Sequence, residues 1–417
     1  MGRIAGRFGR IEPRLRARQL VLGLLADLPR KNCWTIAEHT GGTSPDGLQH
    51  LLARAKWDAD LVRDDLRAFV LEHLADDQAV LVVDETGDLK KGTRTVGVQR
   101  QYTGTAGRIE NAQVAVYLTY ASRHGHAGID RALYLPKSWT SDPRRCHRAS
   151  VPQDIGFATK PQLAAHMIER ALDAGVRAAW AAGDEVYGDN PHLRAALEER
   201  RLGYVLAVAS DHHLTIGPGR FRADALATRI PKRAWQRISA GAGAKGHRWY
   251  DWALLDLPAG PGHHWLMIRR NRRTGALAFY RCFSPRRVPL STLVKVAGSR
   301  WTVEETFQSS KTLTGLDEHQ VRRWDSWHRW VTLALLAHAF LAVTAALERR
   351  DQALADDGSS PNGLIPLTCN EIQRLFTALI APPTRDLAHR LRWSTWRRRH
   401  QARAQRSHYR RQAALQP

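Results

Sequence analysis

The pattern of hydrophobic and polar positions divides the chain into a helical beginning, a strand-rich middle and a helical end. From Arg14 to about Leu74 the apolar residues recur at helical spacing, and from Asp76 they form short β-branched runs. Helical spacing returns from Ser291 to Arg350. This order predicts a central sheet with helices before and after it.

The first stretch contains one amphipathic segment, RARQLVLGLLADL, and two shorter helical segments. The last of these, in TSPDGLQHLLARA, is expected to begin with Ser44 as N-cap and Pro45 in the first turn. Two short helices joined by a glycine-containing turn are typical of a helix-turn-helix, which would direct Gln49, His50 and Arg54 toward DNA. A helical bundle without a DNA role has the same pattern, so both interpretations remain open.

The middle stretch predicts an α/β fold. AVLVVDE is an unbroken apolar run, TVGVQRQYTG and NAQVAVYLTYAS alternate, and RALYLPKSW extends the last of these. A helix over Lys160–Gly175, the strand RAAWAAGD, a helix over Pro191–Arg201 and the strand YVLAVAS follow. We therefore expect a mixed sheet flanked by helices, its first strands antiparallel. The apolar runs VLVV and YVLAVA indicate that both faces are covered.

The remaining segments set the expected domain boundaries. Strand-like pieces such as GHRWYDWALLDL and HHWLMIRRN predict a β-rich insertion. Val331–Leu347 is apolar but slightly short for a bilayer span, and we interpret it as a buried core helix. ADDGSSPNG is a linker, PLTCNEIQRLFTALI is a helix, and an arginine-rich tail with interleaved aromatics favours a nucleic-acid contact. The expected domains are 1–75 (helical, DNA-binding), 76–210 (first part of the core), 211–290 (insertion), 291–350 (second part of the core) and 351–417 (linker, helix and basic tail).

Composition adds a partner class. The chain has 417 residues, 43% of them hydrophobic, and a formal net charge of +23. Such a charge attracts polyanions, of which nucleic acid is the commonest. The four cysteines lie far apart without a CxxC spacing, which argues against a disulfide framework or a zinc site and favours a reducing cytoplasm. The chain opens on an Arg-rich segment with no apolar core, so no signal peptide is expected.

Three acidic doublets stand at the ends of apolar segments: Asp84 and Glu85, Asp184 and Glu185, and Glu304 and Glu305. An ionised carboxylate at the end of a buried strand is costly unless it is paired or binds a metal. Carboxylate oxygens suit Mg²⁺ or Mn²⁺, and two such ions can flank a phosphodiester. Any one doublet is more often a simple turn, but three of them in a basic chain predict one metal-binding site.

Helix geometry selects one member of the third doublet. At 100° per residue, Arg300 lies about 40° and Lys311 about 20° around the helix from Glu304, whereas Glu305 is turned away by about 100°. A carboxylate between two cations on one helical stripe suits a metal with phosphate contacts above and below it. A surface salt-bridge ladder would have the same spacing.

These segments resemble the DDE transposases with a ribonuclease-H-like catalytic domain, most closely the IS701 family of the IS4-related group. The similarity lies in VLVVDETGDLKKGTRTVGVQRQYTGTAGRIENAQV, in KPQLAAHMIERALDAGVRAAWAAGDEVYG and in the stretch that begins SRWTVEETFQSSK. Asp84, Asp184 and Glu304 match the three acidic residues of the family. Arg300, Glu304 and Lys311 satisfy R-x3-E-x6-K of the motif Y-x2-R-x3-E-x6-K, but Ala297 stands at the tyrosine position.

The resemblance implies a DNA transposase that cuts and joins insertion-element ends. Asp84, Asp184 and Glu304 would be catalytic and would bind two Mg²⁺ ions, for which Mn²⁺ can substitute. Double-stranded DNA would be the partner, at element ends and target, with a homodimer forming on it in the cytoplasm and no membrane involved. Arg300 and Lys311 would contact DNA, and Lys90, Lys91 and Arg94 would line its path unless they are solvated turn residues.

Three alternatives remain open. A repurposed transposase would bind DNA without cutting it, although an intact acidic triad argues against this. A basic helix-turn-helix regulator would explain the charge but would leave the buried carboxylates without a role. A glycoside hydrolase would also use carboxylate pairs, but it predicts neither the net charge of +23 nor the stripe from Arg300 to Lys311.

Overall fold

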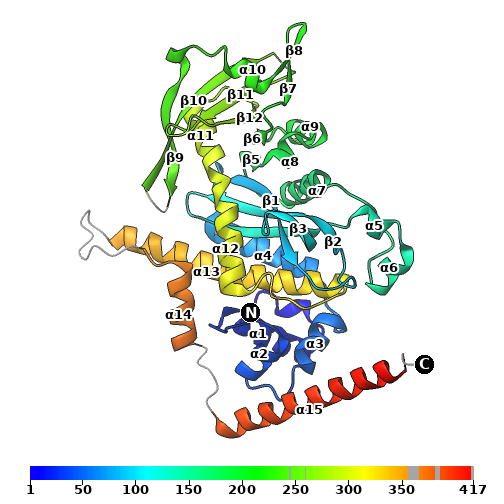
Figure 1. Cartoon of the computed structure of the whole chain (residues 1–417). Helices are drawn as coiled ribbons and strands as arrows, with labels where there is room; N and C mark the ends of the chain where they lie inside the picture. Colours follow the sequence, from blue (N-terminus) through cyan, green and yellow to red (C-terminus); the bar gives the residue numbers. More distant parts are fainter. Residues whose placement is uncertain (244–245, 259, 356–365, 381–385, 415–417) are drawn as a thin grey trace.

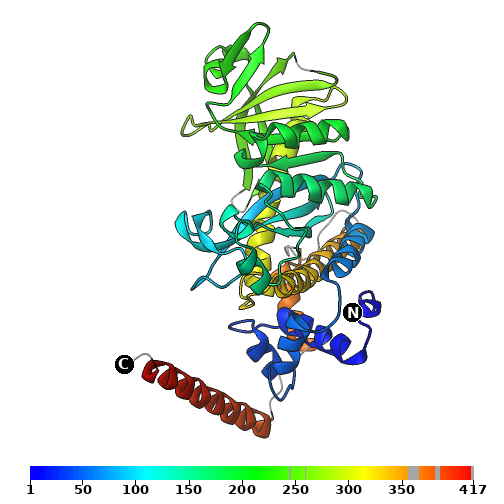
Figure 2. The same cartoon turned by 90° about the vertical axis from the view of Figure 1, so that its right-hand side faces the viewer.

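The structure, a computed structural model of the chain, describes residues 1–243, 246–258, 260–355, 366–380 and 386–414. Most of the linker ADDGSSPNG lies outside these residues. Figures 1 and 2 show an elongated molecule with a helical base, a central sheet and a β-rich upper end. The base contains α1 (Ile11–Leu25), α2 (Cys33–His39) and α3 (Asp46–Ala53), and α4 (Ala59–Leu74) lies above them against the sheet (Figure 1).

The first stretch is helical, as the apolar spacing predicts. Asn32 caps α2 in a reciprocal capping box with Thr35. The N-cap of α3 is Pro45 and not Ser44, although the Ser44 hydroxyl still accepts a hydrogen bond from the Asp46 amide at 3.4 Å. The helix therefore begins one residue later than expected.

The central sheet begins with three antiparallel strands and continues with two parallel ones. β1 (Val80–Leu89) pairs antiparallel with β3 (Arg108–Ser122), and β3 pairs antiparallel with β4 (Gly125–Leu133). On the other side of β1 lie β5 (Trp180–Gly183) and β6 (Gly203–Val208), both parallel to it. A short strand, β2 (Gln99–Thr103), pairs with the beginning of β3. This is the mixed sheet expected of a ribonuclease-H-like fold.

Helices connect the parallel strands. α7 (Lys160–Asp173) precedes β5, and α8 (Glu185–Gly188) and α9 (Pro191–Glu199) join β5 to β6. The segment RALYLPKSW departs from its strand prediction, because β4 ends at Leu133 and α5 (Lys137–Thr140) follows, with α6 (Pro143–Arg148) after it. Pro136 provides the extended N-cap of α5, which the apolar pattern alone does not reveal.

The strands of the insertion extend the central sheet. β12 (Leu277–Ser284) pairs antiparallel with β6, and the sheet continues through β11 (His263–Arg270), β10 (Gly246–Leu257) and β9 (Gln236–Gly243). A separate hairpin of β7 (His213–Ile216) and β8 (Gly219–Arg222) and the short α10 (Ala223–Ala227) lie beside it. The sheet thus has ten strands in the described residues.

Helices return after the insertion. α11 (Leu290–Ser299) and α12 (Trp301–Thr314) run down past the sheet, and α13 (Trp324–Ala355) crosses beneath it (Figure 1). α13 is long and apolar enough to cross a membrane, but 72% of its most apolar 18-residue stretch is buried inside the protein. The structure therefore places Val331–Leu347 in the core, as expected. α14 (Cys369–Leu379) and α15 (Leu387–Ala413) complete the chain.

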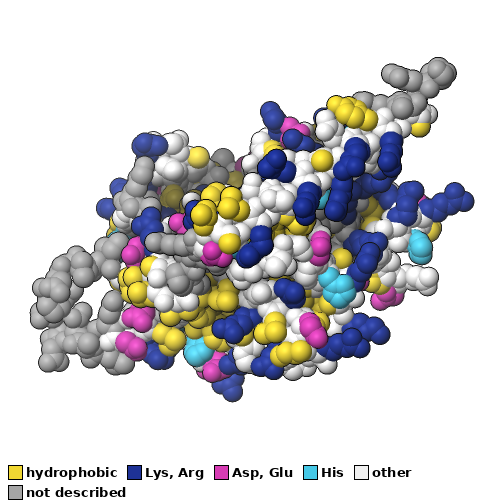
Figure 3. Space-filling model, turned by 90° about the horizontal axis from the view of Figure 1, so that it is seen from below, with side chains coloured by type: hydrophobic (Ala, Val, Ile, Leu, Met, Phe, Trp, Pro, Cys, Tyr) yellow, Lys and Arg dark blue, Asp and Glu magenta, His cyan; other side chains and the backbone are white. Residues whose placement is uncertain are grey.

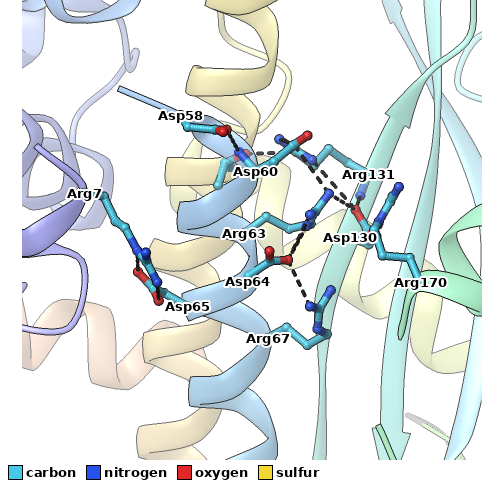
Figure 4. A network of polar contacts seen from close by, with 11 residues as sticks. Arg7, Asp58, Asp60, Arg63, Asp64, Asp65, Arg67, Asp130, Arg131 and Arg170 are labelled. Carbon is cyan, nitrogen blue, oxygen red and sulfur yellow. Dashed lines mark hydrogen bonds and ion pairs between the residues drawn. The ribbon is translucent and has the colours of Figure 1, made fainter. Parts of the chain in front are cut away.

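A partly buried network of charges joins α4 to the sheet (Figure 4). Asp130 on β4 is fully buried and accepts hydrogen bonds from Arg170 of α7 at 2.8 and 3.0 Å. Arg63 of α4 lies 3.6 Å from the same carboxylate, and Arg131 lies 2.8 Å from Asp60 of α4. Burial alone would raise the pKa of Asp60, but Arg131 and Arg63 lower it to about 2. The network joins three elements through charges that depend on one another.

We predict that Asp130→Ala destabilises the fold by about 3–5 kcal/mol, because the Arg63 and Arg131 side chains, only 5% and 1% exposed, would lose a buried counter-charge. Urea unfolding at neutral pH measures this. Asp77→Ala is the control, because that carboxylate is 77% exposed beside Arg177, and its loss should change stability by less than about 0.5 kcal/mol. Equal effects of the two substitutions would contradict a structural role for the network.

Candidate active site

Alternation along β1 separates the two members of the first acidic doublet. Asp84 and Thr86 face α12, because Arg300 Nη1 lies 3.4 Å from Asp84 Oδ2 and Lys311 Nζ donates to Thr86 Oγ1 at 2.8 Å. Glu85 takes the other direction. Its Oε1 accepts from Lys160 Nζ at 2.6 Å, and its Oε2 accepts from the Tyr187 hydroxyl at 2.7 Å. The strand therefore presents Asp84, and not Glu85, to the side of α12 that carries Arg300 and Lys311.

The third acidic residue arrives on α12. Arg300 stands at the junction of α11 and α12, and its Nη2 donates to Glu304 Oε1 at 2.9 Å. Arg300 thus contacts both Asp84 and Glu304. The junction is held against the insertion at Gly298, where an added Cβ would lie 2.1 Å from the Ala240 carbonyl oxygen of β9. Only glycine allows this close approach.

Asp184 reaches the same edge of the sheet from β5. Val82 of β1 is paired with Ala182 of the parallel strand β5. Asp84 and Asp184 each lie two residues beyond this pair, so they are at the same level of the sheet. Asp184 is the N-cap of α8, and its Oδ1 accepts from the Val186 amide at 2.9 Å. Asp184 and Arg300 line one cavity of about 630 Å³.

The site holds more negative charge than its surroundings neutralise. Burial and the neighbouring Asp184 raise the pKa of Asp84 to about 7, although Arg300 opposes this shift. Burial and Glu85 raise the pKa of Asp184 in the same way. An additional cation at this edge would therefore be stabilising.

The donor chemistry of the site fits a hard divalent cation, because Asp84, Asp184 and Glu304 supply only carboxylate oxygens. In the part of the chain that the structure describes, however, no three His, Cys, Asp or Glu side chains are arranged to hold a metal ion. The Arg300 guanidinium, between Asp84 and Glu304, provides the positive charge there.

The second members of the doublets have other surroundings. Glu305 lies 3.4 Å from His126 of β4, whose hydrogen bond lowers the pKa of Glu305, so this side chain faces away from Asp84. Glu185 is exposed. Lys160 and Tyr187, which hold Glu85, were not among the residues singled out from the sequence, since no spacing links them to the first strand.

The predicted DNA contacts are dispersed. Arg300 and Lys311 both reach β1. Lys90 points into the protein, where its ammonium donates to the His319 carbonyl oxygen at 3.2 Å and lies 3.8 Å from Asp88. Lys91 and Arg94 are exposed.

Ala297, at the position of the family tyrosine, lines the cavity with Tyr250 and Tyr280 of the insertion. The aromatic side chains of this cavity therefore come from strands of the insertion and, as Trp301, from α12, but not from α11. Trp252 and Trp265 are each only 1% exposed and belong to the core of the insertion, whereas Trp249 is 45% exposed and lies under Arg237.

Two models of known protein families match the chain. The model described as "DDE superfamily endonuclease" matches residues 4–242, more than half of the chain. The chain belongs to this family. A second model, "Transposase DDE domain", matches residues 158–340. The first match contains Asp84 and Asp184, and the second contains Asp184 and Glu304.

Individual proteins are also similar to the chain. This DDE-family chain is similar to the probable transposase for insertion sequence element IS701 of Microchaete diplosiphon, with 31% identity over 201 residues. That match covers 48% of this chain and spans about half (50%) of the relative. It confirms the resemblance to IS701 transposases. Among solved structures, a piggyBac transposase synaptic complex with hairpin DNA matches with a TM-score of 0.42 and 12% identity, over 92% of this chain and 76% of that one.

We predict that Asp84→Asn stabilises the metal-free protein at pH 8 by more than about 1 kcal/mol and has less effect at pH 4. The pKa of Asp84 in the folded state, about 7, lies above its ordinary value of 3.8, so the folded state holds a proton that the unfolded state has lost between those values. Ionising Asp84 in the fold costs stability that accumulates across this window and is complete above pH 7. Thermal melting in EDTA measures it, with the 74% exposed Asp256, as Asp256→Asn, for control. A lower melting temperature for Asp84→Asn at pH 8 would contradict this account.

Proposed function

We propose that this DDE-family protein is a DNA transposase that cuts insertion-element ends and joins them to target DNA. The observation that carries the proposal is the convergence of Asp84, Asp184 and Glu304 with Arg300 at one edge of the sheet. Asp84 lies in β1 and Asp184 directly follows β5, the parallel strand beside it. Arg300 contacts Glu304 on its own helix and Asp84, which is 216 positions away in the sequence. A transposase function is also supported by the family matches and by the similarity to the IS701 protein.

The reaction we propose has two steps. Water attacks the phosphorus at each element end, and the 3′ oxygen leaves with a proton as a free 3′-hydroxyl. That hydroxyl then attacks a phosphodiester of the target, where the strand's own 3′ oxygen is displaced. Asp84, Asp184 and Glu304 would hold two Mg²⁺ or Mn²⁺ ions, which supply charge stabilisation for the attacking and leaving oxygens.

The chain's own cations would position the DNA. Arg300 has a planar fork of donors that suits two phosphate oxygens, while Lys311 provides a point charge. The guanidinium that pairs with Asp84 and Glu304 in the structure would turn to a DNA phosphate if these carboxylates held metal ions. Glu85, held by Lys160 and Tyr187, would keep the β1 backbone fixed beside Asp84. Exposed Lys91 and Arg94 would line the path of the duplex.

The proposed partner is double-stranded DNA, both element ends and target, and the proposed setting is the cytoplasm. Two element ends must be brought together for joining, which favours a homodimer on DNA. The exposed side chains of Gln49, His50 and Arg54 on and after α3 are compatible with end recognition by the helical base.

A repurposed transposase that binds DNA without cutting is the second candidate. It is favoured by one observation, the placement of Arg300 between Asp84 and Glu304, which leaves the carboxylates paired in the absence of metal. The raised pKa of Asp84 argues against it, because a protein that needs no metal gains nothing from a buried, poorly neutralised carboxylate.

Cleavage of supercoiled DNA that carries candidate element ends, with Mg²⁺, tests the proposed function. We predict that Asp184→Ala and Glu304→Gln each reduce cleavage by at least about a thousandfold, while DNA binding persists. Glu305→Gln is the matched control, because Glu305 is next to Glu304 on the same helix but faces His126, and the variant should retain activity within about threefold. Tight binding by the wild type with no cleavage would favour the repurposed alternative.

Metal binding has a separate readout. We predict that millimolar Mn²⁺ or Mg²⁺ raises the melting temperature of the wild type by a few degrees, because the ion binds the folded state only. Asp184→Asn should abolish most of this increase, whereas Asp256→Asn should keep it. An equal increase in both variants would show that the ions bind elsewhere.

A further inference from the structure

The last helix, α15, has two halves with different surroundings. Its first half packs on the helical base: Trp393 is 1% exposed and its Nε1 donates to the Gly42 carbonyl oxygen at 2.8 Å, and His389 lies 2.8 Å from the Glu38 carbonyl oxygen. Trp396 meets Trp34 of α2 edge to face, with ring centroids 4.6 Å apart. The tryptophans of the tail therefore anchor the helix and are not free to stack on bases.

Beyond His400 the helix leaves the body of the protein. The anchoring stripe of His389, Trp393, Trp396 and His400 would continue through Ala404, Ser407 and Arg411, which offer no large apolar side chain. Described residues 403–411 are all exposed. Figures 1 and 2 both show this half extending sideways from the base, at the opposite end of the molecule from the insertion.

The projecting half carries a second stripe, of arginine. Arg399, Arg403, Arg406 and Arg410 follow one another at helical spacing, about 80° around the helix from the anchoring stripe. They extend over about 16 Å, the axial rise of about five nucleotides of one DNA strand. Three of them line one surface hollow with Arg411. Figure 3, which views the molecule from below, shows Lys and Arg side chains gathered toward this end of the chain.

Within the described residues, no carboxylate pairs with the arginines of the stripe. α15 contains nine arginines and no acidic residue, and among the residues that the structure describes only Arg397 pairs with a carboxylate, that of Glu38. Like charges three and four residues apart on a helix repel one another. Repulsion along an exposed helix is relieved by a linear polyanion whose charges are evenly spaced, as in a nucleic-acid backbone.

We propose that the arginine stripe of α15 is a second DNA-binding surface, which holds the phosphate backbone of double-stranded DNA at a distance from the candidate active site. The anchoring half fixes the direction of the arm, and the stripe supplies affinity without reading sequence. The proposal rests on the proposed function for its partner, but it does not require cleavage. A second copy of the chain is a poorer occupant, because two such arms would repel.

The test uses the full chain with Arg399, Arg403, Arg406 and Arg410 all changed to Gln. Fluorescence anisotropy with a labelled duplex of arbitrary sequence, without divalent metal, gives affinity against salt concentration. We expect the slope of log affinity against log salt to fall by about 3–4 and affinity at 0.1 M salt to fall at least about tenfold. The matched control removes four exposed arginines of the insertion, Arg220, Arg233, Arg273 and Arg286, and should change the slope by less than about 1.

Two further measurements keep the result interpretable. The same four positions changed to Lys should keep most of the salt dependence, because phosphate contacts need charge and not a particular side chain; a Lys variant as weak as the Gln variant would overturn the proposal. Equal losses in the arm and insertion variants, a preference of the arm for RNA, or a changed oligomeric state without DNA would also overturn it. The wild-type protein could fail to cut DNA while the Gln variant still loses affinity and salt dependence. That result would contradict the proposed function but not the DNA-binding role of α15.

Discussion

The candidate site depends on the contact of one guanidinium with two carboxylates. Arg300 joins Asp84 of the first strand to Glu304 of α12, elements separated by the whole insertion. Without a cation at this position, three acidic side chains and Glu85 would meet at a partly buried edge, and their repulsion would oppose the packing of α12 on the sheet. The arrangement of strand, helix and cavity therefore rests on charge neutralisation as much as on apolar burial.

The insertion makes this contact possible. Its strands continue the sheet from β6 outward, and its outer strand β9 meets the junction of α11 and α12 at Gly298. Arg248 of β10 also donates to the carbonyl oxygens of Ala240 and Gly298, at 2.9 and 3.3 Å. The position of Arg300 is thus set from two directions, by the strand it contacts and by the hairpin behind it.

The sequence was sufficient for those parts of the fold that a repeating pattern determines. The apolar runs located β1, β5 and β6, and helical spacing placed Arg300, Glu304 and Lys311 on one stripe, which the contacts to Asp84 and Thr86 agree with. Contacts between residues that no repeating pattern connects could not be predicted from the sequence. Lys160 and Tyr187 meet Glu85 only through tertiary packing, and Lys90 turns inward because Asp88 and His319 are there to receive it. The end of β4 was also predicted too late, because Pro136 starts α5 within an apolar segment that has the pattern of a strand.

The continuous sheet has a consequence for how this protein can be altered. Because β12 pairs along β6 and β9 touches the helix junction, the insertion shares its backbone hydrogen bonds with the sheet that carries Asp184. Removing residues 211–290 to make a minimal core would expose the edge of β6. It would also remove the contact of β9 with the junction of α11 and α12. For protein engineering, the insertion is therefore a structural part of the catalytic core and cannot be exchanged as an independent domain.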